Sequence, residues 1–111
     1  MKKPICDFCS SKSITWAYPC NDFSVTVFMM KKSGELASFE WGSQGGWAAC
    51  EECSALVEAG EWDALAQRGV DTSPSLRILR DHYIDGEVKK AILGLHVEFR
   101  HNRMTETRIL A

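Results

Sequence analysis

The sequence predicts a small α+β domain that is stabilised by a bound metal ion. Two Cys-x-x-Cys pairs, at residues 6–9 and 50–53, supply the metal ligands. Between these pairs the hydrophobic period changes from two residues, typical of strands, to about 3.6 residues, typical of helices. With 111 residues, 45% of them hydrophobic, the chain is long enough for one domain with a modest core.

The four paired cysteines are the strongest candidate site. A gap of two residues lets both thiolates of a pair bind the same ion, and two such pairs supply the four ligands of a tetrahedral Zn²⁺. We therefore predict one structural zinc ion bound by Cys6, Cys9, Cys50 and Cys53. A four-sulfur shell leaves no position for water or substrate, so the predicted site is not catalytic. The alternatives are two redox-active dithiols or four buried thiols.

The remaining cysteine, Cys20, makes the cysteine count odd. An odd count disfavours a framework of disulfides and favours a reducing, cytoplasmic compartment. The first residues lack the apolar segment of a signal peptide, and no apolar run approaches the roughly 20 residues of a membrane-spanning helix. We therefore expect a cytoplasmic protein, and the small-protein style of the sequence suggests a bacterial source. Whether Cys20 contributes to the metal site is left open.

Strands are predicted in the first half of the chain. Residues 14–18 alternate apolar with polar or small side chains, and residues 23–30 are rich in β-branched and aromatic types. A turn at 31–35 leads into a second strand at 36–41, which completes a β-hairpin. The glycine-rich residues 42–46 are predicted to form a flexible loop.

Helical spacing begins at the second cysteine pair. Cys50 and Cys53 fall in the first turn of a predicted helix, where free backbone amides and the helix dipole stabilise thiolates. The next predicted helix starts at Trp62 and carries Arg68 in its last turn, with Gly69 as its C-terminal cap.

Two more helices are predicted after this point. Ser73 and Pro74 have the residue types of an N-cap and a first helical position, and the last helix covers about 86–103. We divide the chain into a zinc-binding core of residues 1–69 and a C-terminal helical segment of residues 70–111 that packs on the core. Together they are expected to form one domain.

The order of these elements resembles the treble-clef zinc finger: a cysteine knuckle, strands with a hairpin, and a helix that begins with the second cysteine pair. The resemblance covers about residues 5–60, and the four cysteines carry it. It implies a fold and a metal but assigns no function, because treble clefs serve many unrelated roles. The segments 6–9, 16–19 and 47–53 also look loosely like small bacterial zinc proteins with no assigned activity.

The function predicted from these observations is a non-catalytic zinc module that binds another protein or a second copy of itself. The net charge of −2 and the aromatic content favour a protein partner over nucleic acid. Trp41 and Trp47 flank the glycine-rich loop, and an exposed tryptophan there is typical of a binding hot spot. The alternative is that the tryptophans build the core.

Nucleic-acid binding is an alternative function. In the last predicted helix, Lys89, His96, Arg100 and Arg103 share one face, and such a basic face can follow phosphates. The same face can also be a solvated helix surface.

A metal-dependent nuclease is a further alternative. The pairs Asp81-His82 and His101-Asn102 resemble elements of HNH-type nucleases, which are often built on treble clefs. The order differs, because the Asp-His pair in zinc-bearing members normally lies between the two cysteine pairs, whereas His82 follows Cys53. Whether the chain is an enzyme is therefore left open, with a non-catalytic role preferred.

Overall fold

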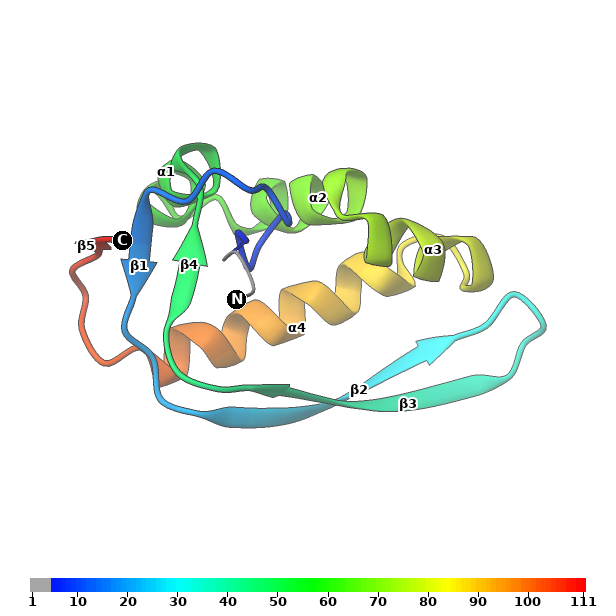
Figure 1. Ribbon diagram of the computed structural model, residues 1–111. Helices are drawn as coiled ribbons and strands as arrows, with labels where there is room; N and C mark the ends of the chain where they lie inside the picture. The colour runs from blue at the N-terminus through cyan, green and yellow to red at the C-terminus, as the bar shows by residue number, and fades with distance from the viewer. Residues whose placement is uncertain (1–4) are drawn as a thin grey trace.

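The computed structural model describes residues 5–111. The elements of that range are, in chain order, β1 (Trp16–Tyr18), β2 (Phe23–Met30), β3 (Leu36–Ser43), β4 (Trp47–Ala49), α1 (Glu51–Ala59), α2 (Trp62–Thr72), α3 (Pro74–His82), α4 (Glu87–Asn102) and β5 (Ile109–Leu110). Strands precede helices along most of the chain, and Figure 1 shows both kinds of element packed into one body. The predicted mixed helix-and-strand class is confirmed.

The strands form two small antiparallel sheets. One has the order β4-β1-β5, and the other is the hairpin of β2 and β3. The hairpin pairs Phe23 with Ser43 at one end and Met30 with Leu36 at the other. The hairpin runs alongside α4, as Figure 1 shows. Val27 is buried on the face of the hairpin that packs against the core. Alternation of apolar and polar residues along both strands therefore places one face on the core and leaves the other exposed.

Helix α4 lies antiparallel to β2 and is attached to it at both ends. At one end, the Met30 amide donates to Glu87 Oε1 at 2.7 Å, and the Ile84 amide donates to the Met30 carbonyl at 2.9 Å. At the other end, the Asn21 amide donates to the Asn102 carbonyl at 2.8 Å. These bonds hold the hairpin along the full length of the helix.

Several boundaries differ from those predicted. Helix α2 continues through Gly69 to Thr72, so Gly69 is not a C-terminal cap but a buried position inside the helix. The short strands β4 and β5 were not predicted, because neither is long enough to show a period of its own. Each exists by pairing with β1, which places Trp16 opposite both Ala49 and Leu110.

Across residues 5–111, the helices are too short or too polar to traverse a lipid bilayer. Residues 1–4, on which the predicted absence of a signal peptide partly depends, lie outside the described residues.

Candidate metal centre

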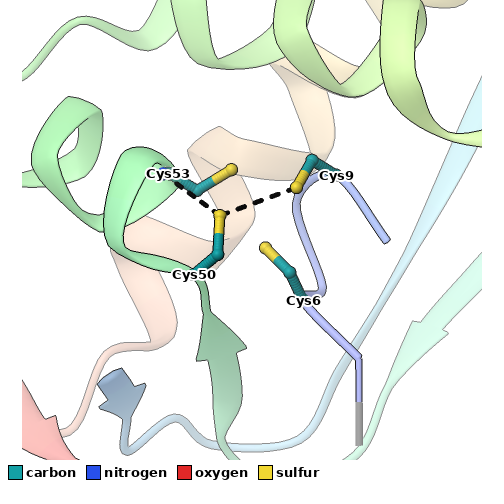
Figure 2. A group of neighbouring side chains, drawn as sticks. All are labelled: Cys6, Cys9, Cys50 and Cys53. Atoms are coloured by element: carbon teal, nitrogen blue, oxygen red, sulfur yellow. Dashed lines mark hydrogen bonds between the residues drawn. The ribbon is translucent and has the colours of Figure 1, made fainter. Parts of the chain in front are cut away.

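The four predicted ligands come together in space. Cys6, Cys9, Cys50 and Cys53 are buried, and their Sγ atoms all lie within 4.8 Å of one another (Figure 2). The Cys9 and Cys50 Sγ atoms are 3.7 Å apart, and all of these cysteines are free thiols. Zn–S bonds of about 2.3 Å in a tetrahedron would place the sulfurs about 3.8 Å apart. The cluster therefore fits a metal ion, as the sequence predicts.

Local backbone geometry aims each pair at this point. In the first pair, the Cys6 amide donates to the Ser11 carbonyl at 2.7 Å, and the Ser10 amide donates to the Cys6 carbonyl at 2.8 Å. Ser10 has a positive φ of 68°, which closes the knuckle. In the second pair, Cys50 is the N-cap of α1, and its sulfur accepts the Cys53 amide at 3.4 Å. Both pairs thus present their sulfurs from tight turns with amides nearby.

The thiols strongly influence one another's ionisation. A hydrogen bond from Cys53 lowers the pKa of Cys6 to about 5, against the effect of burial and with help from nearby backbone amides. The same hydrogen bond and burial raise the pKa of Cys53, and burial raises the pKa of Cys9. One thiolate therefore forms readily, whereas further thiolates are unfavourable until a cation compensates their charge. A divalent metal ion supplies that compensation.

Arg68 contacts the cluster from α2. Its Nε donates to Cys53 Sγ at 3.3 Å, its Nη2 donates to Cys50 Sγ at 3.9 Å, and its Nη1 pairs with Glu52 at 2.8 Å. Burial alone would lower the pKa of Arg68, but the sulfur acceptors raise it, so the guanidinium stays charged. Arg68 thus places a positive charge beside sulfurs that become anionic when a metal binds.

Replacing Arg68 with alanine is expected to weaken metal binding by about tenfold, because outer-sphere partners of metal ligands commonly contribute that much. Competition with a chromogenic chelator would measure the change in affinity. Arg77→Ala is the matched control, since Arg77 is an exposed arginine on α3. Equal affinities for the two variants would show that Arg68 contributes nothing to the site.

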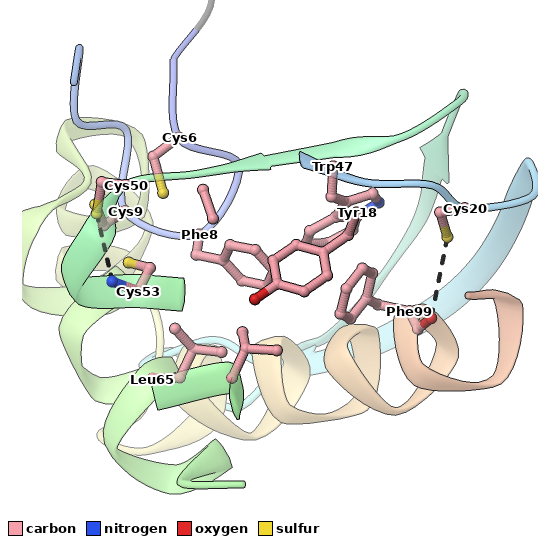
Figure 3. Close-up of a cluster of buried hydrophobic side chains, with 12 residues drawn as sticks. Cys6, Phe8, Cys9, Tyr18, Cys20, Trp47, Cys50, Cys53, Leu65 and Phe99 are labelled. Atoms are coloured by element: carbon pink, nitrogen blue, oxygen red, sulfur yellow. Dashed lines mark hydrogen bonds between the residues drawn. The ribbon is translucent and has the colours of Figure 1, made fainter. Parts of the chain in front are cut away.

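Phe8 anchors the knuckle to the aromatic core. Its ring lies 4.9 Å from the Trp47 ring and 5.4 Å from both the His96 and Phe99 rings. Figure 3 shows Phe8, Trp47 and Phe99 beside the cysteines, with Cys20 at the far side. Cys20 Sγ is 4.0 Å from the Phe99 carbonyl, and Cys20 is not among the cysteines that cluster as metal ligands. Knuckle geometry and core packing therefore depend on each other.

Asp7, which the sequence did not single out, ties the knuckle to β4. The Asp7 amide donates to the Ala48 carbonyl at 2.9 Å, and the Ala48 amide donates to Asp7 Oδ2 at 2.7 Å. Burial raises the pKa of Asp7, and the charge of Cys6 raises it further. Neither Asp7 nor Arg68 could be assigned this position from spacing, because each contact joins segments far apart in the sequence.

The predicted basic face of the last helix is interrupted in the structure. His96 is only 2% exposed and belongs to the aromatic core, so it does not face solvent. Lys89 pairs with Asp63 at 2.9 Å. Arg103 is the C-cap of α4 and has an extended backbone, so it lies outside the helix on which the shared face was predicted. The helical spacing also could not show that α2 packs against part of that face.

The two arginines of the predicted face lie on aromatic rings. The Arg100 guanidinium is 4.5 Å from the centre of the Trp62 ring, and that of Arg103 is 5.0 Å from the centre of the Tyr18 ring. Such stacking leaves edge N–H groups that can still donate. Nucleic-acid binding through these arginines remains a prediction.

His96 should make stability sensitive to acid. Burial, and secondarily the charge of Arg100, lower the pKa of His96 from 6.5 to about 4, and its Nδ1 has no hydrogen-bond partner among residues 5–111. Because the folded pKa is lowered, the unfolded chain binds the proton first, and stability falls as pH drops below about 6.5. We expect a loss of about 2 kcal/mol between pH 7 and pH 5.

Chemical denaturation of wild type and His96→Gln across this range measures that loss. Protonation of the cysteines affects both proteins alike, so the difference in slope isolates His96. Parallel slopes would contradict the assignment.

The tryptophans that flank the loop have different environments. Trp47 is 6% exposed and packs in the aromatic core, with its Nε1 donating to Ser43 Oγ at 2.7 Å. Trp41 is half-buried on β3. Only Trp41 of this pair therefore has substantial surface available to a partner.

The histidines of the nuclease alternative are far apart. His82 ends α3 and precedes α4, whereas His101 lies near the end of α4. A rise of 1.5 Å per residue separates the two ends of α4 by about 20 Å. No single metal ion is within reach of both side chains.

In comparisons with known proteins, no family model, no curated protein and no solved structure matches this chain.

Proposed function

We propose that this protein is a non-catalytic interaction module whose fold is held by one structural zinc ion and which binds another protein. The observation that carries the proposal is the closed cluster of four buried cysteine sulfurs within 4.8 Å of one another. Four sulfurs fill a tetrahedral shell, so substrate has no ligand position at the metal. The metal stabilises the domain, and the surface of the domain provides the function.

A treble-clef arrangement is part of this proposal. Supporting it are the knuckle at Cys6 and Cys9, the hairpin of β2 and β3, and helix α1, which begins directly after Cys50 and contains Cys53 in its first turn. In this order the two cysteine pairs belong to separate elements, the knuckle and the start of α1.

Zinc is preferred for chemical reasons. Tetrahedral four-sulfur sites select Zn²⁺ or iron, and the redox-inert ion suits a site closed to solvent in a reducing cytoplasm. Among residues 5–111, the four cysteines are the only cluster of three or more Cys, His, Asp or Glu side chains with metal-binding spacing. This observation favours a structural role over hydrolytic metal chemistry.

Metal content decides the core of this proposal. The purified protein should contain one equivalent of zinc by mass spectrometry, and cobalt substitution should give the absorption of a tetrahedral four-thiolate site. Bound iron, or a folded protein without metal, would contradict it.

A gel-shift assay at two salt concentrations tests the nucleic-acid alternative, since phosphate contacts make binding salt-dependent.

A further inference from the structure

A groove runs along the free edge of β3. It consists of two hollows of about 400 and 250 Å³ that share Asp7, Trp41 and Leu95 in their linings. The first hollow extends past Glu40 along the strand, and the second reaches Leu76 of α3. We refer to these hollows together as the β3-edge groove. It lies between the hairpin, the Cys6–Cys9 knuckle and the helices α3 and α4.

The edge of β3 in this groove has backbone groups available for hydrogen bonding. The Lys31 amide donates to the Glu35 carbonyl at 2.8 Å, which identifies that pair as hydrogen-bonded. Hydrogen-bonded and non-hydrogen-bonded pairs alternate along an antiparallel ladder. In the observed register, Glu40 and Gly42 therefore direct their N–H and C=O groups away from β2. In the described part of the chain, these groups form no hydrogen bonds.

The charged residues that border the groove are acidic. They are Asp7 and Glu40, and the lining contains no basic residue. Asp7 Oδ2 accepts the Ala48 amide, and Asp7 forms no ion pair with any residue from 5 to 111. The Glu40 carboxylate is turned to the outer face of the hairpin, where it accepts hydrogen bonds from the hydroxyls of Ser24 and Thr26. Asp7 therefore supplies the negative charge of the groove, which is complementary to a cation.

The opposite wall of the groove is apolar. Its side chains are Trp41, Leu76, Ile92 and Leu95. These residues are contributed by β3, α3 and α4. An apolar wall beside a carboxylate and an open strand edge combines the three features that an extended peptide uses for binding.

We propose that the β3-edge groove binds an extended segment of a partner protein, which adds to β3 as a third strand. A lysine or arginine of the segment pairs with Asp7, and a neighbouring apolar side chain packs against Trp41. Backbone hydrogen bonds to Glu40 and Gly42 supply affinity, while the two side-chain positions supply specificity. The inference rests on the proposed function, because Asp7 lies between two of the metal ligands and the knuckle positions it.

Selection from a displayed library of random linear peptides tests this proposal. With the zinc-loaded protein as target, the enriched peptides should share a basic residue close to an apolar one. Asp7→Asn can retain the bond to the Ala48 amide while removing the charge, and it should weaken the best synthetic peptide by about tenfold. Glu106→Gln, which removes an exposed carboxylate elsewhere, should bind like wild type.

Hydrogen exchange provides the second readout. Peptide binding should slow exchange of the Glu40 and Gly42 amides, and a proline in the peptide opposite β3 should abolish binding. Failure to enrich any peptide, or binding unaffected by both Asp7→Asn and the proline, would overturn the proposal. A concentration-dependent dimer that Asp7→Asn dissociates would identify a second copy as the occupant instead.

These outcomes are separable from failure of the proposed function. If the purified protein contains no zinc, the proposed metal-stabilised function is contradicted, whether or not peptides bind to the groove. If zinc is present and peptide selection fails, the structural metal site stands and only the groove assignment is lost.

Discussion

Replacing Cys53 with serine is expected to abolish cooperative folding at 25 °C. Cys53 is fully buried, donates to Cys6 and accepts the Arg68 guanidinium, so its loss removes a metal ligand and two sulfur contacts together. Structural zinc contributes roughly 10–16 kcal/mol in small zinc-binding peptides, whereas whole domains are stable by about 5–15 kcal/mol. A substantial loss of metal affinity therefore exceeds the reserve of this domain.

Thermal melting with simultaneous zinc determination would measure this effect. Cys20→Ser is the matched control, because Cys20 is also buried but lies outside the ligand cluster. The control should retain one zinc ion and a cooperative transition at somewhat lower temperature. A Cys53→Ser protein with the melting temperature and zinc content of wild type would refute the metal-centred account of folding.

The metal centre could be predicted because its information is local. Each cysteine pair is defined by a gap of two residues, and the helix that begins at Cys50 is marked by its own apolar spacing. The hairpin was predictable for the same reason, since eight-residue strands show their alternation clearly. Features of this kind depend on residues that are close in sequence, so they can be predicted without knowledge of the tertiary fold.

Features that depend on distant segments could not be predicted. Arg68 reaches Cys53 only because α1 and α2 fold back on each other, and the C-cap of α2 is Ser73 rather than Gly69. The burial of His96 likewise follows from the packing of the knuckle and α2 against α4. A helical projection shows which residues share a face, but it does not show which part of that face another element covers.

For the substitution Gly69→Ala, the local sequence and the tertiary structure predict opposite effects on stability. Judged from sequence alone, alanine inside a helix should stabilise by about 1 kcal/mol, since glycine is the poorer helix former. In the structure, a Cβ at Gly69 would lie 2.6 Å from the carbonyl oxygen of Phe8. That contact involves two backbone segments, and neither can move aside as a flexible side chain does. We therefore expect a loss of about 3 kcal/mol, the upper range for overpacking.

The metal site should report the same displacement. Phe8 lies between Cys6 and Cys9, so moving its carbonyl shifts the knuckle, and zinc affinity should fall together with stability. Gly94→Ala is the matched control, because Gly94 is also inside a helix and a Cβ there meets no atom within 4 Å. It should stabilise by about 1 kcal/mol with unchanged zinc affinity. Equal stabilisation of both variants would show that α2 does not pack against the knuckle. It would also contradict the contact between Arg68 and the cysteines, which depends on that packing.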